Sequence, residues 1–181
     1  MNTANKITML RVVLIPIYMV LFLCDLTEWA LGVFVLASVS DWLDGYIARN
    51  YNQVTDFGKF VDPLADKVLT TAAFLILLEK GIISSWVVMI ILTREFMVAG
   101  IRMNAASEGK VIAASYWGKL KTVSQMVAVI AGMIMMLPVL NEVIGADLAN
   151  LITNILVWIS TALTVISGVD YLMKNRGVLK M

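Results

Sequence analysis

Apolar residues run in stretches of about 20 along nearly the whole chain, the length at which a helix spans the hydrocarbon core of a bilayer. Short polar segments separate these stretches. The pattern predicts six transmembrane helices, at residues 7–24, 29–48, 60–78, 82–101, 122–140 and 148–169. Because the connections are short and no repeat or low-complexity tract interrupts them, we expect one helical bundle and a single domain over residues 1–181.

The composition agrees with an all-α integral membrane protein. Of the 181 residues, 60% are hydrophobic, and the mean hydropathy is +0.87, which is higher than a soluble domain normally reaches. The net charge of +1 provides no broad basic surface, so we expect no nucleic-acid partner. One cysteine and no histidine exclude an intramolecular disulfide, cysteine or histidine zinc sites and phosphohistidine chemistry.

Basic residues concentrate in alternate polar segments. One set comprises Lys6, Arg11, Arg49, Lys59, Arg102, Lys110, Lys119, Lys121, Lys174, Arg176 and Lys180. The opposite connections contain Asp25, Glu28, Glu79, Glu142 and Asp147, with only Lys80 as a cation. The positive-inside rule therefore predicts that both termini lie in the cytoplasm, which is consistent with six spans.

Four carboxylates stand out at the cytoplasmic ends of the second and third predicted helices. Asp41 and Asp44 belong to one helix, and Asp62 and Asp66 belong to the next. Each would cost about 2.5 to 3.5 kcal/mol at the centre of a membrane span if nothing compensated its charge. Bound divalent cations would offset this cost, because Mg²⁺, Mn²⁺ and Ca²⁺ prefer carboxylate oxygen ligands.

Helical geometry places these carboxylates on two narrow stripes. A stripe of about 140° on the second helix contains Asp41, Asp44, Gly45, Ala48 and Arg49, and a narrower stripe on the third contains Gly58, Asp62 and Asp66. If the two helices pack antiparallel, the stripes face each other across a groove. Four carboxylates there can hold two divalent ions about 3.5 to 4 Å apart, an arrangement used for displacement at phosphorus.

The pattern D-x2-D-G-x2-A-R-x8-G-x3-D-x3-D, complete from Asp41 to Asp66, resembles the signature of the CDP-alcohol phosphotransferases. The resemblance covers the whole chain, because six spans with cytoplasmic termini are that family's architecture. It implies transfer of a phosphatidyl or similar group from a CDP-linked donor to an alcohol, with release of CMP. It also implies two divalent cations, Mg²⁺ or Mn²⁺, a homodimer and a site facing the cytoplasm, in bacteria at the cytoplasmic membrane.

By the same resemblance, individual residues acquire expected roles. Asp41, Asp44, Asp62 and Asp66 would bind metal, and Asp66 would also be the base that activates the acceptor hydroxyl. The CDP part of the donor would be bound by Asp44, Gly45, Ala48, Arg49 and Gly58. Arg49 is suited to this task because a guanidinium forms bidentate contacts with phosphate oxygens.

Other charged residues within the predicted helices indicate what kind of acceptor binds. Arg94 and Arg102 lie about 80° apart around one helix, so both can face the bundle interior and bind an anionic group. The stretches Asn5-x-x-Thr8-x-x-Arg11, Arg94-Glu95-x4-Gly100-x-Arg102 and Gly118-Lys119-x-Lys121-Thr122 resemble those of family members that transfer the phosphatidyl group of CDP-diacylglycerol to the sn-1 hydroxyl of glycerol 3-phosphate. This resemblance assigns the acceptor phosphate to Thr8, Arg11, Arg94, Arg102, Lys119 and Lys121.

Several alternatives stay open at this point. The acceptor could be serine, inositol phosphate or phosphatidylglycerol, each of which would need a differently charged pocket. The basic residues near the interface could serve topology or contact anionic lipids, and Lys67 could pair with a neighbouring carboxylate. A divalent-cation transporter is a further hypothesis, but the carboxylates collect at one membrane face rather than at several depths.

Overall fold

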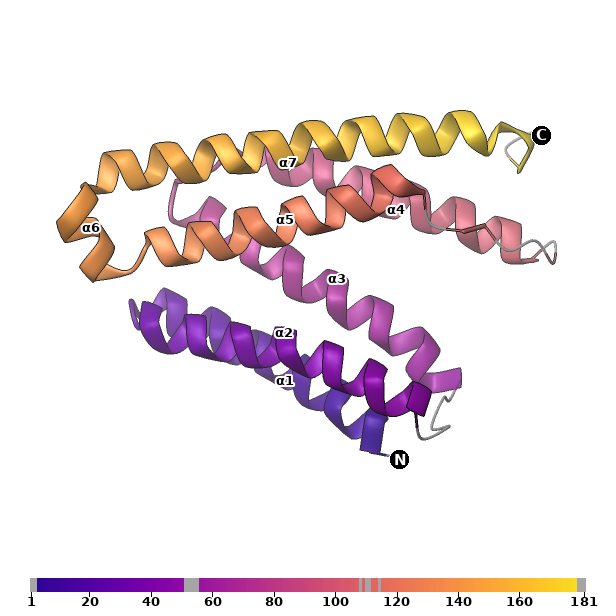
Figure 1. The fold of residues 1–181 in the computed structure, drawn as a ribbon, viewed down its shortest axis with the longest axis horizontal. Coiled ribbons are helices and arrows are strands. Elements are labelled where there is room, and N and C mark those ends of the chain that lie inside the picture. The colour runs from indigo at the N-terminus through magenta and orange to yellow at the C-terminus, as the bar shows by residue number, and fades with distance from the viewer. Residues whose placement is uncertain (1–2, 51–55, 108, 110–111, 114, 179–181) are drawn as a thin grey trace.

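The computed structural model describes the backbone of residues 3–50, 56–107, 109, 112–113 and 115–178, and the side chains of these residues other than 3–4, 41–50, 56–60 and 178. All regular structure in these residues is helical (Figure 1). The elements are α1 (Thr3–Leu23), α2 (Thr27–Asn50), α3 (Asp56–Glu79), α4 (Ser85–Ser107), α5 (Tyr116–Met135), α6 (Pro138–Ile144), α7 (Ala146–Lys174) and the short 3₁₀ helix η1 (Arg176–Val178). The prediction of an all-helical chain is confirmed for the described residues.

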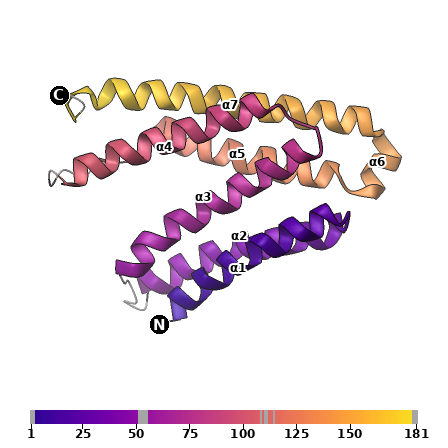
Figure 2. The ribbon, with the colours of Figure 1, turned by 180° about the vertical axis from the view of Figure 1, so that it is seen from behind.

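The long helices form two groups that α3 connects. Helix α1 packs against α2 and α3, whereas α4 and α5 pack against α7 (Figures 1 and 2). The start of α1 and the end of α7 lie at the same end of the molecule as the start of α3, the end of α4 and the start of α5. We call this the signature end, because α3 carries Asp62 and Asp66 there. Helix α6 lies at the opposite end.

Two described helices are long and apolar enough to cross a membrane, over Asn5–Leu23 in α1 and over the whole of α7. The number rises to three if α5 and α6 together form one broken span. Helix α4 falls short because Arg94, Glu95 and Arg102 interrupt its apolar run. The membrane character expected from composition therefore has support in two or three candidate spans, whereas six spans stay a prediction.

The expected continuous span over residues 122–140 is wrong in one respect. Helix α5 ends at Met135, and α6 begins at Pro138 with its axis turned by 81°. The break arises because proline lacks an amide hydrogen and keeps the preceding residue out of the helical region. Leu137 accordingly has an extended backbone, with φ −64° and ψ 134°. The apolar sequence continues through this break, so a hydropathy pattern does not reveal it.

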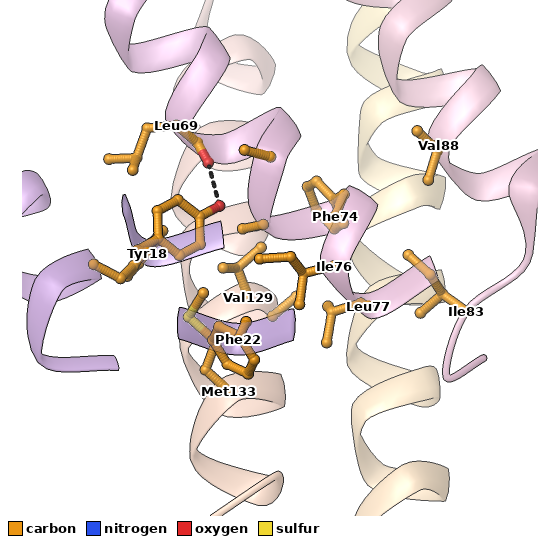
Figure 3. Packing of buried hydrophobic residues seen from close by; sticks show 14 of the residues in the cluster. Tyr18, Phe22, Leu69, Phe74, Ile76, Leu77, Ile83, Val88, Val129 and Met133 are labelled. Atoms are coloured by element: carbon orange, nitrogen blue, oxygen red, sulfur yellow. Dashed lines mark hydrogen bonds between the residues drawn. The ribbon is translucent and has the colours of Figure 1, made fainter. Parts of the chain in front are cut away.

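Buried aromatic and aliphatic side chains join α1, α3 and α5 (Figure 3). The Tyr18 hydroxyl donates to the carbonyl oxygen of Leu69 at 3.4 Å, and its ring meets Phe34 edge-on at a centroid distance of 5.6 Å. Val129 and Met133 of α5 pack into the same cluster. The hydroxyl of a buried tyrosine needs a partner, and this contact together with the packing of the ring ties α1 to α3. The two helices that meet at Asp62 are thereby aligned.

Polar contacts tie the connections together at the end opposite the signature end. Asp25 in the α1–α2 turn forms a salt bridge with Lys80 after α3, with 2.5 Å between Oδ1 and Nζ. Asn154 of α7 donates to the carbonyl oxygen of Ile82 at 2.8 Å. Closer to the bundle centre, α5 approaches α7 at Gly132, where an added Cβ would lie only 2.9 Å from Cγ2 of Thr153. These contacts set the spacing of α3, α5 and α7.

Candidate functional site

Helix α3 presents two signature carboxylates one helical turn apart. Asp62 and Asp66 are both partly buried, and the four-residue spacing puts them on one face. The Thr8 hydroxyl of α1 donates to Oδ1 of Asp62 at 2.7 Å, and Thr8 itself is only 1% exposed. This hydrogen bond orients the Asp62 carboxylate. Metal-binding carboxylates are commonly oriented by such a hydrogen bond.

Arg11 lies one turn further along α1 and is fully buried. Its Nε donates to Oγ of Ser40 at 3.4 Å, and the Ser40 hydroxyl donates to the carbonyl oxygen of Ala37 at 2.7 Å. Ser40 directly precedes Asp41 in α2. Thr8 and Arg11 therefore contact the two helix segments that carry the signature, Thr8 on α3 and Arg11 on α2.

Part of the predicted site lies outside the described side chains. These residues are Asp41, Asp44, Gly45, Ala48, Arg49 and Gly58. Their backbone places the first five in α2 and the last in α3. The expected metal and donor roles of this set stay predictions.

A cavity of about 490 Å³ opens between α3, α4 and α5. Its charged lining comprises Asp66 and Lys67 from α3, Arg94, Glu95 and Arg102 from α4, and Lys119 and Lys121 from α5. The structure thus brings together Asp66 and four of the six residues that the sequence assigned to the acceptor phosphate. The other two, Thr8 and Arg11, are not among the described residues of this lining. Five basic and two acidic groups make the cavity suitable for an anion.

Glu95 organises the basic residues of this cavity. Its Oε1 accepts hydrogen bonds from Nζ of Lys121 and, at 3.1 Å, from Nη1 of Arg94. Its Oε2 lies 3.9 Å from Nζ of Lys67, so the expected pairing of Lys67 with a neighbouring carboxylate is confirmed. The side chain of Lys121 is only 6% exposed. A buried cation needs such a counter-charge, and Glu95 supplies it.

The two arginines of α4 also contact α7. Nη2 of Arg94 donates to the Ser167 hydroxyl at 2.7 Å, and Nε of Arg102 donates to the Tyr171 hydroxyl at 3.3 Å. Ser167, Tyr171 and Glu95 were not among the site residues predicted from the sequence. A usable signal was present, because polar residues recur at three- and four-residue spacing along α7, at Ser160, Thr164, Ser167 and Tyr171.

The arrangement combines two kinds of chemistry at one end of the bundle. The carboxylates of Asp62 and Asp66 offer oxygen ligands suited to hard divalent cations. The basic lining next to Asp66 suits a phosphate group, because guanidinium and ammonium groups form charge-assisted hydrogen bonds with phosphate oxygens. If the phosphate of a ligand binds to this basic lining, the other groups of that ligand lie close to the Asp66 carboxylate.

Comparison with known proteins relates the chain to one enzyme family. The family model of CDP-alcohol phosphatidyltransferases matches residues 1–166. A Bacillus subtilis protein named CDP-diacylglycerol--glycerol-3-phosphate 3-phosphatidyltransferase is 41% identical over 194 residues, covering 99% of this chain and 97% of its own length. A Haemophilus influenzae protein of the same name is 34% identical over 186 residues, covering 98% and 95%. A Mycobacterium tuberculosis protein named probable phosphatidylglycerophosphate synthase is 38% identical over 181 residues, covering 96% and 81%.

Proposed function

The chain belongs to the CDP-alcohol phosphatidyltransferase family, and we propose that it transfers the phosphatidyl group of CDP-diacylglycerol to the sn-1 hydroxyl of glycerol 3-phosphate. Relatives named for this reaction match almost the full chain at 34 to 41% identity, which supports the choice of substrates. In the structure, the observation that carries the proposal is the cavity that sets Asp66 beside five basic side chains. The products are phosphatidylglycerophosphate and CMP, which makes this an enzyme of phospholipid synthesis.

In the proposed reaction the acceptor hydroxyl oxygen attacks the phosphorus of the phosphatidyl group. A new bond forms between that oxygen and phosphorus, and the bond from phosphorus to the CMP oxygen breaks, so its electron pair leaves with CMP. Asp66 takes the proton of the attacking hydroxyl, as a positioned carboxylate can. The acceptor phosphate is held by Arg94, Arg102, Lys119 and Lys121, which keeps the hydroxyl close to Asp66.

The donor is held by the α2 part of the signature in this proposal. Asp44, Gly45, Ala48, Arg49 and Gly58 bind the CDP moiety, with the glycines and the alanine leaving room for a diphosphate close to the helix backbone. Arg49 binds phosphate oxygens. This division puts the donor on the α2 side of Asp66 and the acceptor on the α4 and α5 side.

The four signature aspartates fit a pair of divalent cations. They offer only oxygen ligands, come in pairs from two neighbouring helices, and include Asp62, whose carboxylate Thr8 already orients. We assign them Mg²⁺ or Mn²⁺. When bound, the cations neutralise the diphosphate and polarise the reacting phosphorus–oxygen bond.

Release of CMP by the purified protein in liposomes tests the function. With CDP-diacylglycerol and Mg²⁺ or Mn²⁺, we expect release with glycerol 3-phosphate, and background release with serine, inositol phosphate or phosphatidylglycerol. A chelator should lower the rate by more than about 100-fold because the four carboxylates then lose their counter-charge, and added Mg²⁺ should restore it. Full activity in chelator would refute the metal assignment. Release with a different acceptor only would refute the substrate.

The membrane arrangement is part of the same proposal. It comprises six spans in one domain over residues 1–181, cytoplasmic termini, a cytoplasmic site and a homodimer. Support comes from the common position of the start of α1 and the end of α7 at the signature end. Homologues from bacteria favour the cytoplasmic membrane.

Labelling of the chain's single cysteine tests this orientation. Cys24 is exposed and directly follows Leu23, the last residue of α1, whose end lies opposite the signature end. We expect a membrane-impermeant maleimide to label it in intact spheroplasts. In the matched variant Cys24→Ser with Ser107→Cys, whose cysteine lies at the end of α4, labelling should require permeabilisation. The reverse result would invert the topology.

A further inference from the structure

The two arginines of the acceptor cavity converge on one short stretch of α7. Arg94 and Arg102 are eight residues apart, which is about 12 Å along α4, whereas their partners Ser167 and Tyr171 are four residues apart, about 6 Å along α7. The two helices run side by side toward the signature end (Figure 1). Arg94 and Arg102 are therefore both anchored on one turn of α7.

Arg94 lies in a space that two glycines leave open. A Cβ added at Gly168 of α7 would lie 3.2 Å from Cγ of Arg94, and one at Gly118 of α5 would lie 3.6 Å from its Nη2. The first distance is tighter than an ordinary contact, so a side chain at position 168 would displace the arginine. Arg94 is consequently enclosed between α5 and α7, with a side chain that is only 11% exposed.

Arg102 is held in a different way. Besides its hydrogen bond to the Tyr171 hydroxyl, its guanidinium carbon lies 5.7 Å from the centroid of the Tyr171 ring. Tyr171 is buried and packs with Val98 and Ile101 of α4, so its ring is itself fixed. A cation over a fixed aromatic ring is attracted by the negative charge on the ring face, and its side chain loses rotational freedom.

We propose that Ser167, Gly168 and Tyr171 of α7 are positioning residues that hold Arg94 and Arg102 ready for the phosphate of the acceptor. This inference rests on the proposed function and deepens it. A free arginine loses much side-chain entropy when it binds a ligand, and an arginine that is already held loses less. Helix α7 carries none of the signature, and this assignment gives its cytoplasmic part a role in recognising a phosphorylated acceptor.

Kinetics of two conservative variants test the assignment. We expect Ser167→Ala and Tyr171→Phe each to raise the KM for glycerol 3-phosphate about fivefold, because each removes one hydrogen bond to a charged group. The KM for CDP-diacylglycerol and kcat should stay within about twofold. The matched control is Ser160→Ala, since Ser160 is equally buried in α7 but its hydroxyl donates to the carbonyl oxygen of Val157 in its own helix. An equal effect of Ser160→Ala, or an equal rise of both KM values, would overturn the inference.

A double variant shows whether Ser167 acts through Arg94. In an Arg94→Ala background, the further change Ser167→Ala should leave the KM for glycerol 3-phosphate unchanged, because the group that Ser167 holds is gone. If Ser167→Ala has its full effect in that background, Ser167 does not act by positioning Arg94.

Anion binding separates this inference from the proposed function. We expect inorganic phosphate to raise the thermal unfolding midpoint of the wild-type protein, and to raise that of Ser167→Ala less. A wild-type protein that is stabilised by phosphate but inactive with glycerol 3-phosphate would refute the function, and weaker stabilisation of Ser167→Ala would still support the positioning role. Normal activity together with unchanged KM and unchanged stabilisation in both variants would refute the positioning role alone. A wild-type protein that is neither stabilised nor active would refute both.

Discussion

Replacing Asp66 by asparagine is expected to lower kcat for CMP release by about 10²- to 10⁴-fold, the usual contribution of a positioned general base. Asparagine has nearly the same shape as aspartate but does not accept the proton of the acceptor hydroxyl. Asp66 is a signature carboxylate that lines the cavity together with Arg94 and Lys121, so it lies where the acceptor's reacting end would be. The measurement is kcat at saturating glycerol 3-phosphate with the purified variant.

Two comparisons make this result specific to proton transfer. Asp170→Asn is the matched control, because Asp170 also lies at the signature end but pairs with Lys174 of its own helix at 2.7 Å. Its kcat should equal that of the wild type. Binding of CDP-diacylglycerol to Asp66→Asn should persist, and a tenfold rise in Mg²⁺ should not restore its kcat. Wild-type turnover in Asp66→Asn would contradict the base assignment, and recovery with added metal would make Asp66 a metal ligand only.

Replacing Arg94 by alanine is expected to raise the KM for glycerol 3-phosphate about 10- to 100-fold, since a hydrogen bond to a charged group contributes about 1.5 to 3 kcal/mol. The fold should survive, because Glu95 keeps Lys121 and Lys67 as counter-charges. The KM for CDP-diacylglycerol should change by less than about threefold. Initial rates measured against each substrate in turn provide both values.

Charge and shape can be separated at the same position. Arg94→Lys keeps the charge but loses the planar fork that binds two phosphate oxygens, so an intermediate KM is expected. Arg176→Ala removes an exposed cation beyond the end of α7 and should leave both KM values unchanged. An acceptor KM in Arg94→Ala equal to that of the wild type would remove Arg94 from the acceptor site.

The positions of the long helices could be predicted because a helix that spans a bilayer needs a long run of apolar residues. A chain in hydrocarbon must satisfy its backbone hydrogen bonds within each helix, so helices coincide with long apolar runs. The six predicted stretches correspond to α1 to α4, α5 with part of α6, and α7. The turn at Pro138 was missed because Met136, Leu137 and Val139 are all apolar, and the change in direction depends on one backbone conformation.

The sequence predicted which site residues share one face of a helix, but it did not predict which residues of different helices contact each other. The shared orientation of Arg94 and Arg102 follows from the helical repeat alone, and both line the cavity. The contact of Thr8 with Asp62 and that of Arg94 with Ser167 depend on which helices are neighbours and at what height. Those relations arise from packing of side chains far apart in sequence, which apolar periodicity does not encode. The α2 half of the signature stays a prediction from its spacing.

The ion pair between Asp25 and Lys80 bears on how the chain enters the membrane during synthesis. In the proposed topology, the α1–α2 hairpin crosses first and delivers a carboxylate to the far side. The α3–α4 hairpin follows and must carry Lys80 across, against the general tendency of cations to remain in the cytoplasm. The order of synthesis thus places the anion on the far side before its cation arrives. In that topology the pair joins the first hairpin to the second at the far end of α3, away from the signature carboxylates.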